Sequence, residues 1–168
     1  MNKIIYLSIL IIVFSCSEGN IKKTQNGDSK YQEVLKLKDG FKVTHSPEEG
    51  KAMLNGRSGS KYTWLYKTTV EAKQDITILE FGAFGLYNGQ WIFGTYTGKP
   101  FTTKDFEEWY NCPNGKLLAN KKYLDSKNWT GGELLEKSET LWYYIGKTES
   151  GEIVKAIAKL TSLAETQD

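Results

Sequence analysis

The chain of 168 residues is long enough for one domain of ordinary size and too short for a multidomain enzyme. Hydrophobic residues make up 39% of it and charged residues 25%, a balance that excludes a disordered or collagen-like chain. The 22 basic and 20 acidic residues give a net charge of +2, and Arg57 is the only arginine. We therefore expect no nucleic-acid partner, because the chain lacks the basic surface and the guanidinium groups that recognise phosphates and base edges.

The N-terminus is typical of an export signal. Lys3 precedes an apolar run, residues 4–14, that is broken only by Ser8 and is too short for a membrane-spanning helix of about 20 residues. A buried first strand or helix is the alternative, but the chain turns polar directly after Cys16 and stays polar to about Lys30. This pattern favours a signal peptide over residues 1–15.

The segment Val13-Phe14-Ser15-Cys16 resembles the lipobox of bacterial lipoproteins. The resemblance implies that Cys16 receives lipid and that acyl chains anchor the protein, at roughly 0.8 kcal/mol per buried methylene. Residues 16–30 are then the lipidated cysteine with a flexible tether, and residues 31–168 are a single domain. The implied location is the cell envelope, with the protein anchored to the outer membrane and facing the periplasm or the cell surface.

Apolar alternation and turn residues predict a domain rich in strands. We expect a hairpin over 34–44 turning at Asp39-Gly40, a short helix over 47–55 after a Ser46 cap, and a strand over 62–70. A second short helix is expected over 102–110 and a long ordered loop over 111–139. A closing hairpin joins 141–147 to 152–161, with Val154 and its alternate neighbours on the same face as Leu141, Tyr143 and Ile145.

The clearest local pattern is Asn88-Gly89, which suits a type I′ turn between residues 76–87 and 90–96. A turn of two residues fixes which side chains share a face. One face is expected to carry Phe84, Leu86, Trp91 and Phe93. The other carries Phe81, Tyr87, Ile92 and Tyr96 around Ala83, Gly85 and Gly94, where the missing side chains leave aromatic rings accessible.

Several short strands with few helices favour a mainly β fold in which two antiparallel sheets stack as a sandwich. The Leu141–Ile145 hairpin and the number of strands give it an architecture that resembles immunoglobulin-like and fibronectin-like domains. This resemblance implies one domain with one or two short helices, and it carries no function with it.

No catalytic group stands out. His45 is expected at the surface or at a helix cap, and Cys112 at the negative end of a helix is expected to be an inert thiol. The acids Asp105, Glu107 and Glu108 fit the first turns of a helix better than a pair of catalytic carboxylates. With one histidine and no paired cysteines, we expect no metal and no cofactor.

The aromatic residues are too many for a small core, and an outward row of rings is how a sheet stacks on a sugar or a partner protein. The expected contacts with a ligand are Phe81, Tyr87, Tyr96, Trp109 and Trp129, with Trp129 on a flexible loop. The predicted function is noncatalytic binding of a protein or a polysaccharide at the membrane. The alternatives are a scaffold subunit of an envelope assembly and, less favoured, a small hydrolase.

Overall fold

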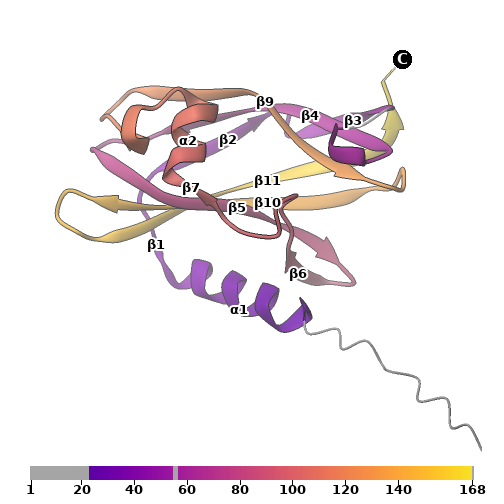
Figure 1. The fold of residues 1–168 in the computed structure, drawn as a ribbon, viewed down its shortest axis with the longest axis horizontal. Coiled ribbons are helices and arrows are strands. Elements are labelled where there is room, and N and C mark those ends of the chain that lie inside the picture. The colour runs from indigo at the N-terminus through magenta and orange to yellow at the C-terminus, as the bar shows by residue number, and fades with distance from the viewer. Residues whose placement is uncertain (1–22, 55–56, 168) are drawn as a thin grey trace, which may run out of the picture.

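The computed structural model describes residues 23–54 and 57–167 (Figure 1). The expected signal peptide, 1–15, and the expected lipid acceptor Cys16 lie outside the described residues. None of the described helices is long and apolar enough to cross a bilayer. The elements in chain order are α1 (Lys23–Lys36), β1 (Lys38–Asp39), β2 (Lys42–Ser46), β3 (Glu49–Leu54), the 3-10 helix η1 (Arg57–Gly59), β4 (Tyr62–Glu71), β5 (Ile76–Tyr87), β6 (Gln90–Phe93), β7 (Phe101–Thr102), α2 (Thr103–Tyr110), the 3-10 helix η2 (Pro113–Gly115), β8 (Lys116–Leu117), β9 (Lys122–Gly132), β10 (Ser138–Thr148) and β11 (Ile153–Thr166).

The strands form one mixed sheet that curls into a half-barrel. β4 pairs with β2 and β3 along one side and with β9 along the other, since Trp64 has a partner in both β3 and β9. β11 runs parallel to β1 and β3 and antiparallel to β10. β10 pairs with β5, whose other side carries the short strands β6, β7 and β8. The two edges of the curl are therefore β9 and the β5–β6 region.

The mainly β class is confirmed, but the two-sheet, immunoglobulin-like sandwich is not what the chain forms. The described strands belong to one continuous sheet, and it contains parallel pairs. The alternation of apolar residues marks a strand but does not identify its partner, and parallel pairs need a long crossover connection that leaves no turn pattern in the sequence.

Sequence patterns confined to a few consecutive residues predicted the structure well. β4 covers the expected strand, and α2 begins at a capping box in which Thr102 and Asp105 each accept from the other's backbone N–H. In the β5–β6 hairpin, Asn88 and Gly89 both have positive φ, and Phe84 pairs with Phe93 as expected from the two-residue turn. β6 then ends, and Phe81 pairs with Phe101 of β7 instead of Tyr96.

Three local predictions were wrong. Residues 34–44 are the end of α1, then β1 paired with β11, then β2 paired with β4, so they form no hairpin. The expected helix over 47–55 is strand β3, which buries Gly50 and Ala52 between β4 and β11. The expected loop over 111–139 contains η2, β8 and the whole of β9. In each case pairing with a distant strand overrode the local pattern.

The closing hairpin β10–β11 is present, but its register differs by one residue from the expected pairing of Val154, Ala156 and Ala158 with Leu141, Tyr143 and Ile145. Ala156 pairs with Tyr144, and Ala158 pairs with Trp142, whereas Ile145 pairs with Lys155. A shift of one residue in register moves every side chain to the other face of the sheet. The rings of Trp142 and Tyr144 are consequently the ones that join Ala156 in the interior.

Two apolar clusters lie on opposite faces of β5 and β10. The larger cluster fills the inside of the curl and includes α2 through Phe106 and Tyr110. The smaller one holds α1 against the outer face, where Val34 is buried and Tyr31 lies over Phe84. Figure 1 shows the two helices on opposite sides of the sheet. The described residues start at Lys23 with α1, which overlaps the tether expected over 16–30.

Candidate functional site

A cavity of about 1200 Å³ opens between the two edges of the curl. Its walls come from the β5–β6 hairpin, the segment before β7, α2, β9 and β10. α2 contacts β5, β7 and β9, so it covers one end of the gap between the two edges. The cavity lies at the other end of this gap. Small residues help to form the hollow, because a Cβ built on Gly85 meets no atom within 4 Å. The size exceeds that of most small-molecule sites, which are roughly 300–1000 Å³, and suits an extended ligand.

Aromatic rings run from the mouth of this cavity to the core. The rings of Tyr96 and Trp129 stack with centroids 6.0 Å apart at 22°, so they bridge the loop after β6 and the edge strand β9. Tyr96 also lies 5.4 Å from Phe101, whose ring is 4.6 Å from that of Trp109. These contacts join the two edges of the half-barrel across its open side.

The structure brings four of the expected ligand contacts to this cavity: Tyr87, Tyr96, Trp109 and Trp129. Tyr87 and Tyr96 are 66% and 61% exposed, and both tryptophans are half-buried. Trp129 does not lie on a flexible loop as expected, since it is part of β9.

Phe81, the fifth expected contact, is not part of the cavity wall. Its side chain is fully buried beneath the cavity, with its ring parallel to that of Tyr144 at 5.3 Å and edge-on to Trp109. The expectation placed it opposite Tyr96, at the accessible end of the hairpin. Because β6 ends at Phe93 and β7 takes over the pairing, Phe81 is covered by Phe101.

The polar floor of the cavity, which the sequence did not predict, comes from β9 and includes a bulge. Ser126 and Lys127 stand opposite the single residue Lys67, where the register with β4 shifts. Side chains on a regular strand alternate between faces, so Asp125 and Asn128 belong on opposite faces without the bulge. With it, both are buried and both line the cavity.

Asp125 is only 8% exposed, and its Oδ1 accepts a hydrogen bond of 2.9 Å from the backbone N–H of Lys127. Burial raises the pKa of its carboxyl, while the Lys127 hydrogen bond and the charge of Arg57 oppose the rise. Arg57 lines the same cavity and donates from Nη1 to the backbone carbonyl of Lys127 at 3.1 Å. The backbone of Lys127 therefore holds both groups: its N–H binds the carboxylate of Asp125, and its carbonyl binds the guanidinium of Arg57.

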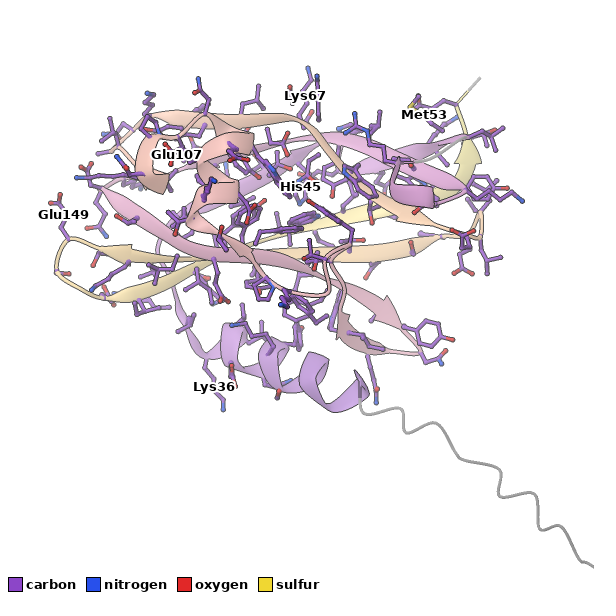
Figure 2. All side chains as sticks on the ribbon, in the orientation of Figure 1. Lys36, His45, Met53, Lys67, Glu107 and Glu149 are labelled. Carbon is purple, nitrogen blue, oxygen red and sulfur yellow. The ribbon has the colours of Figure 1, made fainter. Side chains whose placement is uncertain are left out.

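His45, expected at the surface, is only 4% exposed. Figure 2 shows its label among the strands in the middle of the molecule. Its Nδ1 lies 3.0 Å from Oγ1 of Thr68, and burial lowers the pKa of the ring to about 4. Nearby, Trp142 donates to the hydroxyl of Tyr66 at 2.6 Å, and burial raises the pKa of that tyrosine well above its usual value. The side chains of His45, Tyr66 and Trp142 are all buried, and of the three only Trp142 also lines the cavity.

The other candidates for chemistry lie on α2 or directly after it, and Glu108 is the one among them that lines the cavity. Cys112 is fully buried, and burial raises the pKa of its thiol to about 11, as expected for an inert group. Asp105 caps α2, and Glu107 is exposed on the same helix (Figure 2). Over residues 23–54 and 57–167, no three His, Cys, Asp or Glu side chains gather in a way that could hold a metal ion. No family model, curated protein or solved structure matches the chain.

Proposed function

We propose that the chain is a noncatalytic binding module, anchored by lipid on Cys16 in the cell envelope, that takes a polysaccharide segment into the aromatic cavity. The observation that carries the proposal is the stack of Tyr96 on Trp129 over a cavity of about 1200 Å³. Aromatic rings and polar groups meet there in an open groove, in which an extended chain of sugar rings fits better than a compact cofactor.

The chemistry of sugars matches such a surface. A sugar ring presents C–H groups on its faces and hydroxyl groups around its rim, so a flat aromatic ring covers the face while polar residues reach the rim. Tyrosine and tryptophan serve this purpose well because they offer a large apolar face with little conformational freedom to lose. Tyr87 and Tyr96 are exposed enough to meet a ligand without rearrangement of the fold.

The anchor is consistent with a short distance between the domain and the membrane. Residues 17–22 separate Cys16 from the start of α1 at Lys23. A stretch of this length spans at most about 25 Å when fully extended. A binding module held this close to a bilayer samples polymers of the envelope at the membrane surface.

The test is a titration of the full chain in detergent micelles with envelope polysaccharides, followed by tryptophan fluorescence. Trp129→Ala is expected to weaken binding about fivefold or more, because stacking on an aromatic side chain contributes roughly 1–3 kcal/mol where nucleic-acid bases are the ligand. Trp91→Ala is the matched control, since Trp91 stacks on Tyr31 on the α1 side of the sheet, at 6.0 Å. An equal loss of affinity in both variants contradicts the proposed site.

A scaffold subunit of an envelope assembly is the second candidate, favoured by apolar side chains at one end of the sheet. Tyr62 of β4 pairs with Leu54 of β3 on one side and with Gly132 of β9 on the other. Leu54 and Leu134, which follows Gly132 by two residues, are both largely exposed. Large exposed apolar residues that lie together mark protein interfaces. Copurification with one partner at constant stoichiometry, without affinity for glycans, favours this candidate.

A further inference from the structure

We infer that the glycan segment held in the cavity is uncharged, because Asp125 and Arg57 both line it, both bond to the backbone of Lys127, and each repels one sign of charge. This inference rests on the proposed function and deepens it by naming the class of sugar. It predicts selection of neutral sugars over uronic acids and over amino sugars.

The carboxylate is fixed in place by the backbone. Asp125 is nine-tenths buried, lines the cavity, and alternates regularly with the buried Tyr123 ahead of the bulge in β9. One of its oxygens accepts from the N–H of Lys127 at 2.9 Å. A ligand carboxylate, sulfate or phosphate brought to this floor meets a buried charge of its own sign, which is costly where water is excluded.

The guanidinium is fixed by the same residue. Nη1 of Arg57 donates to the carbonyl of Lys127 at 3.1 Å, and the backbone N–H of Arg57 donates to Oγ1 of Thr63 at 2.8 Å. The charge of Arg57 acts on Asp125, so the two groups partly neutralise each other. A ligand ammonium group therefore gains less from Asp125 and is repelled by Arg57.

A neutral hydroxyl group can pair with both Asp125 and Arg57. A hydroxyl both donates and accepts, so it can donate to Asp125 and accept from Arg57. Thr130 of β9 and Thr140 of β10 add two more hydroxyls, whose oxygens lie 3.4 Å apart on the cavity wall. An acceptor (Asp125), a donor (Arg57) and threonine hydroxyls that can do both therefore suit the neighbouring hydroxyl groups on the rim of a sugar ring.

The experiment titrates the full chain in detergent micelles with three oligosaccharides of equal length: a neutral glucan, an oligogalacturonate and a glucosamine oligomer. We expect the neutral glucan to bind at least about tenfold more tightly than either charged one. We also expect its affinity to change less than about twofold between 0.05 and 0.5 M salt, because no net charge is paired on binding.

Asp125→Asn is the decisive variant. Asparagine keeps the oxygen that accepts from Lys127 and removes the charge, so affinity for the oligogalacturonate is expected to rise about tenfold, with that for the neutral glucan changed only a few-fold. Glu107→Gln, which removes an exposed carboxylate outside the cavity lining, is the matched control and is expected to change neither. If Asp125→Asn lowers the unfolding midpoint so far that binding cannot be measured, Arg57→Gln serves instead and is expected to raise affinity for the glucosamine oligomer.

The outcomes separate this inference from the proposed function. Tighter binding of either charged oligosaccharide by the unmodified chain, lost in Trp129→Ala, overturns the inference and leaves the glycan site standing. An unchanged preference in both Asp125→Asn and Arg57→Gln also overturns it. Absence of binding to all three oligosaccharides removes the proposed function as well.

Discussion

Oγ1 of Thr68 lies 3.0 Å from Nδ1 of His45 inside the curled sheet. The same oxygen accepts from Nδ2 of Asn128 at 2.8 Å, and Oδ1 of Asn128 accepts from the backbone N–H of Trp129, also at 2.8 Å. A buried chain of hydrogen bonds therefore runs from β2 through β4 to the backbone of a residue that lines the cavity. The two links made by Thr68 are buried, so removing its hydroxyl leaves polar groups without water to replace the lost partner.

Thr68→Val is expected to lower the free energy of unfolding by about 1–3 kcal/mol. Valine keeps the β-branched shape but leaves Asn128 without an acceptor and His45 without its hydroxyl partner. Urea denaturation followed by circular dichroism measures the change. Thr69→Val is the control: Thr69 lies on the other face of β4 without a hydrogen-bonded side chain in the described structure, so its change is expected within about 0.5 kcal/mol. Equal losses of stability in the two variants contradict a stabilising role for this series of hydrogen bonds.

The buried ring of His45 makes stability depend on pH. Burial lowers the pKa of the folded-state ring to about 4 from the ordinary 6.5. Between these values the unfolded chain binds a proton that the folded chain does not, so the free energy of unfolding falls as the pH falls from about 6.5 to about 4. The full effect is up to about 3 kcal/mol.

Other groups titrate in the same range, so the measurement is a difference between two chains. The pKa of Asp125 is raised in the folded state, which acts in the opposite direction. His45→Asn keeps an acceptor near Thr68 and does not titrate, so its stability is expected to fall less on acidification than that of the unmodified chain. Parallel pH profiles from urea denaturation contradict the prediction.

The turn between β5 and β6 tests a purely local requirement. Gly89 has a φ of +76°, and a Cβ built on it meets no atom within 4 Å, so alanine there adds backbone strain and no clash. Such strain costs about 1–2 kcal/mol, and Gly89→Ala is expected to lower the Tm by roughly 2–8 °C. Gly85→Ala, with a negative φ and open space around it, is expected to leave the Tm within about 2 °C.

The elements that could be predicted from the sequence are those whose determinants lie within a few residues. Asn88-Gly89 specifies both the β5–β6 turn and its register, and the Thr102–Asp105 capping box specifies the start of α2. β3 and β9 were missed because they are stabilised by partners distant in the chain, and polar residues such as Lys127 and Asn128 give β9 no clear alternation.

The candidate site divides in the same way. Tyr96 and Trp129 could be singled out as aromatic residues without an evident place in the core. Their stacking could not, because it depends on the curl that brings the two edges of the sheet together. Asp125 was missed because the segment was expected to be a loop, and Asn128 because the bulge opposite Lys67 that brings it to the same face has no mark in the local sequence.

Cys112 offers a test of how tightly the interior is closed next to α2. Its thiol is fully buried, and burial raises its pKa to about 11. In a chain carrying Cys16→Ser, Cys112 is the only thiol, and at pH 8 about one molecule in a thousand carries the reactive thiolate. A disulfide reagent is therefore expected to label the native protein only as fast as the structure opens, and to label one thiol at once in concentrated urea. Immediate labelling of the native chain contradicts the burial of Cys112 in the larger apolar cluster.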